Sequence, residues 1–232
     1  MSNRKKPIAS ALAALALALA ACSGTEKQGS LYAAGDVARP QAMLQASRSA
    51  AESALREPGR GDKQGLAEKG IEAAERCLMA APENPGCYYW RAVNTGIYHS
   101  VRIAGYQRGV KRMVADCEKI IQIDPGYENA GAYRMLGQIY TKLPQTAIHP
   151  GSVTRDIELA ESYLRKAVQL APGYPENRLA LAEALFENGK VKDAIEELAQ
   201  ANELAPHWRR DISYDQWKHE SLALERRIGK AQ

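Results

Sequence analysis

Between Pro172 and Pro206, apolar residues recur every three or four positions, which is the spacing of one face of an α-helix. The pattern is interrupted once, at Asn188-Gly189, where a left-handed residue would end a first helix, and Pro206 would stop a second. Small and large residues alternate along both segments, so that two helices can approach closely and still fill the space between them. These positions are Leu181, Ala182, Leu185, Ala194, Leu198 and Ala201. The stretch therefore predicts an antiparallel helical hairpin.

A similar pattern precedes this hairpin, but with a longer connection. The spacing of the second helix recurs over 157–171 and ends at Pro172, and residues 132–140 supply the first helix. The segment 144–152 between them contains two prolines and has no periodic pattern. We therefore expect an elaborated turn over 143–153, of a length that is often either functional or mobile.

Weaker helix pairs lie further upstream, and one more helix follows the last hairpin. The upstream pairs are 88–99 with 113–123, and 41–56 with 65–80 across a turn at 58–62. Residues 211–228 place apolar side chains on one face and charged ones on the other, as expected of a helix that covers the open end of a stack. Together these patterns predict an all-α fold, a short right-handed solenoid of helical hairpins with an elaborated middle repeat and a C-terminal capping helix.

The first residues have the pattern of an export signal. Arg4, Lys5 and Lys6 precede an uncharged apolar run that is shorter than the roughly 20 residues of a membrane-spanning helix. The run ends in Leu-Ala-Ala-Cys, which resembles the lipobox of bacterial lipoproteins and implies cleavage before Cys22 and acylation of that residue. The alternative is an ordinary cleaved signal followed by a chance cysteine. In the enterobacterial lipoproteins that this pattern resembles, Ser rather than Asp after the cysteine, as at Ser23, implies sorting to the outer membrane.

These features divide the chain into four parts. We expect a lipoprotein signal peptide at 1–21, a flexible tether at 22–38, a helical repeat domain at 39–206 and the capping helix at 207–232. On this division the mature domain faces the periplasm. It is attached by lipid to the cell envelope, more readily at the outer membrane than at the inner one.

Charge and motif content narrow the possible functions. The chain has 31 Lys and Arg residues against 27 Asp and Glu, but three of the basic residues and no acidic ones lie in the predicted signal. The mature chain is therefore close to neutral and has no basic stripe, so nucleic acid is not an expected partner. The sequence has no phosphate-binding glycine loop, nucleophile elbow or His-Glu-x-x-His pair. We expect a protein without catalytic activity or cofactor.

Three cysteines of the mature domain lie in helices that are predicted to pack together. Export to an oxidising compartment permits a disulfide between Cys77 and Cys87 or between Cys87 and Cys117. The alternative is that all three are small buried apolar side chains. There is no Cys-x-x-Cys, and each histidine is isolated, so the sequence predicts no metal site. His149 in the elaborated turn is the one histidine that we would test for metal binding.

The inner surface of such a stack is built mainly by the first helix of each hairpin and is the candidate binding site. On the helical register, Tyr89, Asn94, Arg134, Gln138 and Lys142 point out from these helices. Arg and Asn bind carboxylates and backbone amides, and Tyr offers contact area at low entropic cost. The five residues therefore suit an extended peptide or an acidic group. The alternative is a solvated groove without a ligand.

The sequence resembles two protein families, one broad and one specific. The 34-residue interval from Pro172 to Pro206, with its small and large positions, resembles the tetratricopeptide repeat (TPR). Residues 124–137, 142–144 and 160–172 resemble the T component associated with tripartite ATP-independent periplasmic (TRAP) transporters, over roughly residues 40–206. That resemblance implies a periplasmic lipoprotein that binds a substrate-binding protein, with a small ligand passing through a central cavity, as a homotrimer. The Gly-Asp often found in the elaborated turn is absent here.

Three functions compete on this basis. The principal hypothesis is a lipid-anchored periplasmic scaffold that binds protein partners, with the TRAP-associated role as its specific form. The second is a carrier of small apolar ligands, with a cavity between the helices and the elaborated turn as its lid. The third is an assembly lipoprotein for an envelope machine such as a pilus or a secretion pore.

Overall fold

Helix-forming segments alternate along the chain with short breaks at proline and glycine, and the computed structural model follows this division. It describes residues 34–102, 104–146 and 149–231, and within them all regular structure is helical. The helices are α1 (Ala34–Arg56), α2 (Arg60–Ala80), α3 (Pro85–Val101), α4 (Tyr106–Ile123), α5 (Tyr127–Lys142), α6 (Ile157–Leu170), α7 (Pro175–Glu187), α8 (Val191–Leu204), the short 3-10 helix η1 (Ala205–Trp208) and α9 (Tyr214–Ala231). The predicted signal peptide, Cys22 and residues 22–33 of the predicted tether lie outside the described residues. The predicted end of the tether at residue 38 is wrong, because α1 already begins at Ala34.

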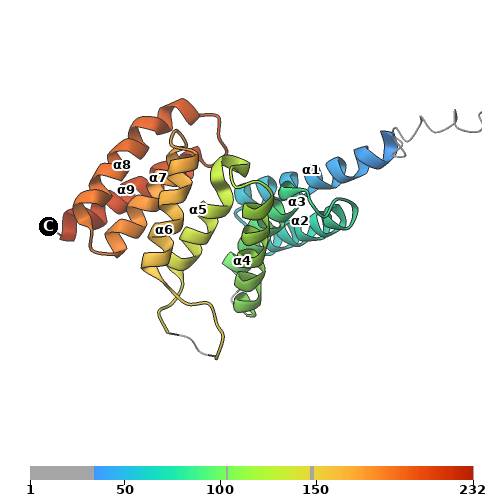
Figure 1. Cartoon of the computed structure of the whole chain (residues 1–232), viewed down its shortest axis with the longest axis horizontal. Helices are drawn as coiled ribbons and strands as arrows, with labels where there is room; N and C mark the ends of the chain where they lie inside the picture. Colours follow the sequence, from blue (N-terminus) through green and yellow to red (C-terminus); the bar gives the residue numbers. More distant parts are fainter. Residues whose placement is uncertain (1–33, 103, 147–148, 232) are drawn as a thin grey trace, which may run out of the picture. The chain divides into compact units, whose positions relative to one another are not determined.

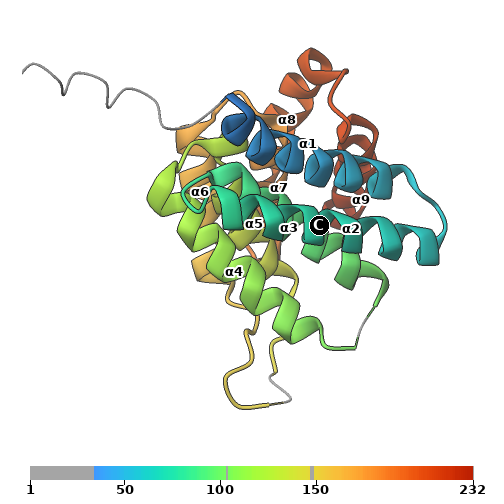
Figure 2. The ribbon, with the colours of Figure 1, turned by 90° about the vertical axis from the view of Figure 1, so that its right-hand side faces the viewer.

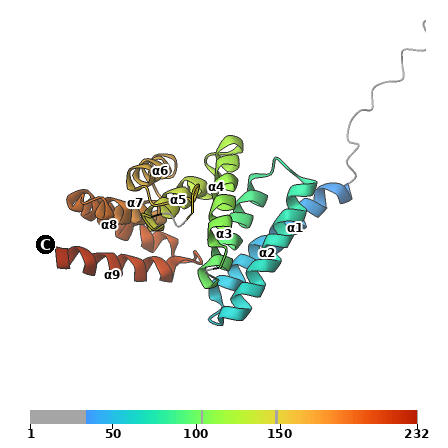
Figure 3. The same ribbon diagram turned by 90° about the horizontal axis from the view of Figure 1, so that it is seen from below.

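Residues Arg39–Gln232 form one compact unit, and its helices stack in pairs. Helix α3 packs on α4, α5 on α6 and α7 on α8, and the pairs adjoin through α2 with α3, α4 with α5 and α6 with α7 (Figures 1 and 3). The first helices of successive pairs also touch: α3 contacts α5, and α5 contacts α7. The predicted fold, an all-α solenoid of helical hairpins, is therefore confirmed. Within the part of the chain that the structure covers, no helix is long and apolar enough to span a bilayer.

The helices begin and end where the local chemistry requires it. Pro85 and Pro175 occupy the first turns of α3 and α7, where the missing N–H would have no helical partner anyway. Gly189 follows α7 with a φ of +74°, the left-handed break that the sequence predicts. The predicted turn at 58–62 is too long, because α2 already begins at Arg60. An acidic residue in its first turn, Asp62, complements the helix dipole and favours this earlier start.

Two apolar clusters fill the stack. One is built by helices α1 to α5 and includes Trp90, Ile120 and Leu136. The other is built by α6 to α9 and has Leu181 and Leu185 among its fully buried members. Helix α9 covers this second cluster with three buried side chains, Trp217, Leu224 and Ile228. The cap therefore forms by burying the apolar face that its sequence pattern predicts.

A left-handed turn opens α5. Glu128, Asn129 and Ala130 have φ values of 49°, 56° and 60°, in a region that residues other than glycine rarely occupy. Such a conformation persists only where the surroundings impose it. Here the carbonyl of Asn129 accepts hydrogen bonds from Nδ2 of Asn177 at 3.0 Å and from Nη1 of Arg134 at 3.4 Å. The turn sets the direction in which α5 leaves α4.

Candidate binding surfaces

Arg134 is buried, which contradicts the sequence-based assignment of this residue to an exposed binding surface. Its relative exposure is 5%. Nη1 donates to Oδ1 of Asn177 at 3.0 Å, Nη2 donates to the hydroxyl of Tyr89 at 3.2 Å, and Nε lies 3.3 Å from Oε2 of Glu176. Burial alone would lower the pKa of Arg134, but the Glu176 carboxylate and neighbouring tyrosines raise it above its usual value. The guanidinium therefore stays charged and links α3, α5 and α7.

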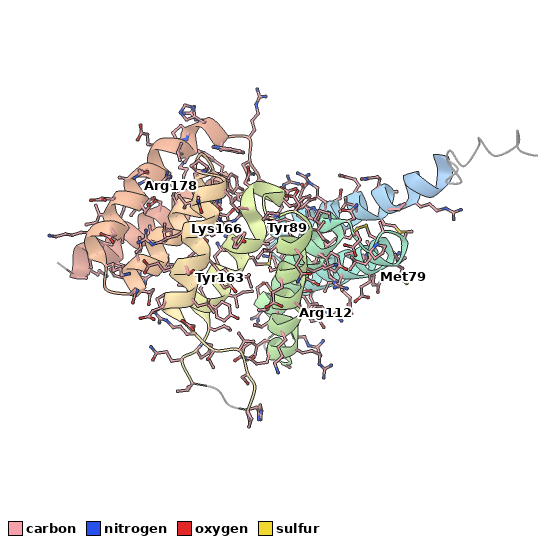
Figure 4. All side chains as sticks on the ribbon, in the orientation of Figure 1. Met79, Tyr89, Arg112, Tyr163, Lys166 and Arg178 are labelled. Carbon is pink, nitrogen blue, oxygen red and sulfur yellow. A yellow bond between two sulfur atoms is a disulfide. The ribbon has the colours of Figure 1, made fainter. Side chains whose placement is uncertain are left out.

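Tyr89 and Asn94 are also buried, so their assignment to an exposed wall is wrong as well. Tyr89 is 7% exposed and lies inside the helical stack (Figure 4). Burial raises the pKa of its hydroxyl far above the usual range, which keeps it protonated. Asn94 is fully buried, and its Nδ2 donates to the carbonyls of Ser47 and Trp90 at 3.0 and 2.7 Å. The physical reason is that helices on two sides cover α3: Gly131 and Arg134 of α5 pack against Tyr89, and Ser47 of α1 and Gly70 of α2 lie against Asn94.

Gln138 and Lys142 remain accessible and lie together. They line a small pocket of about 100 Å³ between α5, α7 and α9. Nζ of Lys142 lies 3.3 Å from the carboxylate of Glu183. The same carboxylate forms an ion pair with Nη1 of Arg227 in α9 at 3.5 Å. Nε2 of Gln138 reaches Glu176 at 3.5 Å. Because these charges compensate one another, the pocket offers polar contacts for a partner without a strong net field.

An apolar hollow of about 660 Å³ opens between α3, α4, α5 and the start of the elaborated turn. This volume falls in the range of sites for small molecules. Its apolar lining comprises Tyr106, Val110, Met113, Met135, Ile139, Leu143 and Pro144. The polar side chains that line it are His99, Ser100, Gln138 and Lys142. Two methionines make the wall adaptable, because an unbranched thioether can repack around ligands of different shape.

The elaborated turn is fastened next to this hollow. Nε2 of Gln107 in α4 donates to the carbonyl of Val153 at 3.0 Å, and Oε1 of the same side chain accepts the N–H of Val153, also at 3.0 Å. Nearby, the N–H of Arg155 donates to the carbonyl of Pro144 at 3.0 Å, and the guanidinium pairs with Glu187 at 2.6 Å. The described ends of the turn are thus held in place by α4 and α7.

One of the two predicted cysteine pairings is present in the structure. Cys77 and Cys87 form a disulfide with their Cα atoms 5.7 Å apart, across the turn from α2 to α3. Cys117 is a free, buried thiol, and burial raises its pKa well above the usual value. It is therefore a poor nucleophile. His149 is exposed, and over the described ranges no three metal-ligating side chains come together.

Sequence reasoning proposed a cavity between the helices without assigning residues to it, and it missed a buried carboxylate. Met113 and Met135 sit on apolar helix faces like any core residue, and only the spacing between helices leaves a space beside them. Glu161 is 7% exposed and accepts from Lys190 at 2.8 Å, Asn188 at 3.0 Å and Arg165 at 2.9 Å. Its position four residues after Ile157 and three before Leu164 was the available signal, because this spacing places it on the apolar face of the helix, where a carboxylate requires partners.

Comparison with known proteins agrees with this architecture. The tetratricopeptide repeat family matches residues 155–212. Among solved structures, TTC0263, a thermophilic TPR protein of Thermus thermophilus, is similar with a TM-score of 0.56 at 20% identity, covering 79% of this chain and 81% of the other. MamA (41-end) from Desulfovibrio magneticus RS-1 matches with a TM-score of 0.47 at 16% identity, over 79% of this chain and 96% of the other. No curated protein sequence matches the chain.

The fold, the family match and the likeness to TTC0263 define the class. The chain is an all-α solenoid of the tetratricopeptide type, with a tetratricopeptide repeat at 155–212. Stacked helical repeats of this kind present extended surfaces that serve for protein–protein interaction. The likeness to TTC0263 concerns the fold, since the identity is 20%.

Proposed function

We propose that the chain is a lipid-anchored scaffold of the bacterial cell envelope that binds protein partners. The observation that supports it most is the stack of helical hairpins that follows a lipobox-like sequence ending at Cys22. Repeat solenoids bind other proteins through extended surfaces. Several acyl chains on Cys22 would hold that surface permanently at a membrane. Of the five residues that the sequence nominates for binding, Gln138 and Lys142 are accessible to a partner.

The anchor and the partners are tested separately. Mass spectrometry of the purified full chain is expected to show acylated Cys22 as the first residue, and Cys22→Ala is expected to accumulate as unacylated precursor. An unmodified mature N-terminus would refute the anchor. For partners, the tagged full chain is crosslinked in cells with formaldehyde and extracted in detergent. We expect a small reproducible set of envelope proteins that an equally tagged, unrelated lipoprotein does not recover, and identical recovery would refute the scaffold.

The specific form of this proposal is a TRAP transporter-associated component. The resemblance over roughly residues 40–206 supports it, and it predicts that a periplasmic substrate-binding protein is among the crosslinked partners. It also predicts a trimer in detergent, which sedimentation analysis of the full chain measures. Capture of envelope proteins that never includes a substrate-binding protein would remove this form and leave the scaffold standing.

A second candidate function is favoured by the apolar hollow of about 660 Å³ between α3, α4 and α5. A carrier of small apolar ligands would bind them there, beside the elaborated turn. Met135→Trp should fill this space and lower the amount of apolar compound that organic extraction and mass spectrometry recover from the purified chain. Met79→Trp is the matched control, because Met79 is 78% exposed on α2 (Figure 4). Equal recovery of apolar compound from both variants would exclude the hollow as its binding site.

A further inference from the structure

A groove of about 770 Å³ opens between α1 and the segment that joins α8 to α9. Helix α1 contributes Arg48, Glu52 and Arg56 to one wall, and residues 206–212 form the other. The two walls are far apart in sequence but adjacent in space, as the position of α1 beside the start of α9 illustrates (Figure 2). The second wall carries His207, Arg209 and Arg210.

The acidic groups of the groove are already engaged, whereas most of its arginines are not. Glu52 forms an ion pair with Arg48, with its Oε1 2.9 Å from Nε. Asp211 accepts the N–H of Ser213 at 2.9 Å and the hydroxyl of Tyr174 at 3.5 Å. Arg56, Arg209 and Arg210, in contrast, form no ion pair with any carboxylate that the structure describes. Three arginines without an ion pair, against one such carboxylate at Asp211, leave the two facing walls with a net positive charge that attracts an anion.

The groove also has a fixed aromatic element. Nε1 of Trp208 donates to the carbonyl of Gly173 at 3.0 Å, and its ring packs edge-on against Tyr174 with centroids 4.9 Å apart. Ile212, next along the same wall, is 38% exposed. A rigid aromatic side chain beside arginines is the combination that dominates binding energy at protein interfaces. An exposed apolar residue at the same place provides contact for the non-acidic side chains of a ligand.

We infer that this arginine groove binds an extended, acidic segment of a protein partner. The inference rests on the proposed scaffold function and adds the chemistry of the partner. Arginines on opposite walls can each bind a carboxylate of a chain that passes between them, and charge-assisted bonds of this kind are strong. A bilayer surface is a plane and cannot enter between two walls. A protein segment is therefore a better occupant than an anionic membrane.

The test measures binding of a fluorescein-labelled peptide of alternating glutamate and tyrosine residues to the full chain in detergent, by fluorescence anisotropy. The comparison peptide has glutamine in place of glutamate. The groove variant combines Arg56→Glu and Arg209→Glu. The matched control combines Arg226→Glu and Lys230→Glu, which make the same change of charge at exposed positions of α9 outside the groove. Helicity and melting temperature check that each variant folds, and Arg56→Gln with Arg209→Gln replaces the groove variant if it does not.

We expect the acidic peptide to bind at least about tenfold more tightly than the neutral one. The groove variant should bind the acidic peptide at least about tenfold more weakly than the unaltered chain does, as for charge pairs at an interface. The control variant should stay within about twofold. Equal losses in both variants would mean general attraction between charges and would overturn the inference. So would unchanged peptide binding in the groove variant together with loss of binding to soluble glycerophosphoglycerol, the headgroup of phosphatidylglycerol, since the groove would then bind lipid headgroups.

The same variants separate this inference from the scaffold proposal. If the groove variant still captures the full set of envelope proteins in cells, the groove is not the partner site, and the scaffold function stands. If the unaltered chain captures no envelope protein but binds the acidic peptide through the groove, the peptide site stands and the scaffold function falls.

Discussion

The guanidinium of Arg134 and the side-chain amide of Asn177 meet in the buried centre of the solenoid, with Nη1 3.0 Å from Oδ1. Both side chains also donate to the carbonyl of Asn129, in the left-handed turn that opens α5. Nδ2 of Asn177 further reaches the carbonyls of Ala167 and Ala171 at the end of α6. One pair of residues thus fixes the turn before α5, the end of α6 and the start of α7. It joins two consecutive repeats through hydrogen bonds in addition to apolar packing.

Replacing Arg134 by alanine should destabilise the fold. The change would leave Glu176 and Asn177 without their partner, and removal of one member of a buried ion pair typically costs about 3 kcal/mol or more. Urea unfolding followed by circular dichroism measures this. Lys142→Ala is the control, because its pair with Glu183 is exposed and contributes about 1 kcal/mol or less. Equal midpoints for the two variants would show that the network does not hold the repeats together.

Gly137→Ala should be destabilising although alanine favours helices. A Cβ at Gly137 would meet the side chain of Leu164 inside van der Waals contact, where α5 packs on α6. Overpacking of this kind costs about 1–3 kcal/mol. Gly65→Ala in α2 meets nothing within 4 Å and should instead stabilise by about 0.5–1 kcal/mol. Thermal melts of both variants measure these changes. A rise in melting temperature for Gly137→Ala would contradict the close approach of Gly137 to Leu164.

Loss of the disulfide should lower stability without changing the fold. Cys77 and Cys87 are separated by 10 positions, and closing a loop of that length stabilises by about 3 kcal/mol. Dithiothreitol should therefore lower the urea midpoint of the unaltered chain and of Cys117→Ala to the same extent. The double variant Cys77→Ala with Cys87→Ala should not respond to it. A response that depends on Cys117 would indicate the other pairing.

Glu161 should make the stability of the repeat dependent on pH in the acid range. Burial would raise the pKa of Glu161, but hydrogen bonds from Lys190, Asn188 and Arg165 lower it below the usual value of 4.5. A lowered pKa in the folded state means that the carboxylate stabilises the fold above pH about 4.5 and that this contribution disappears as the pH falls through the folded pKa.

The variant Glu161→Gln reports this contribution. The difference in free energy of unfolding between it and the unaltered chain should be constant near neutral pH and shrink below pH about 4.5. Glu196→Gln makes the same change at an exposed position of α8 and serves as the matched control for the loss of one carboxylate. A difference that grows toward acid pH would show that the lysine and asparagine do not hold a charged carboxylate.

The sequence alone determined the order of the helices and the way the hairpins pack. Alternating small and large residues such as Ala160, Leu164 and Ala167 are enough for this, because each helix presents one apolar face at a fixed period and can bury it only against a neighbour. The breaks at Gly189 and Pro206 follow from backbone chemistry that acts within a few residues. The cap over residues 214–231 follows from the same rule, since an open stack leaves an apolar face that must be covered.

Tertiary structure decided which polar side chains a partner can reach. Helical register places Arg134 and Gln138 on one side of α5, but only the positions of α3 and α7 bury the first and leave the second accessible. The same holds for the arginine groove, whose walls at Arg56 and Arg209 come from α1 and from the segment between α8 and α9. The physical reason is that burial and electrostatic field depend on distances between elements, which are set by superhelical stacking and leave no local pattern along the chain.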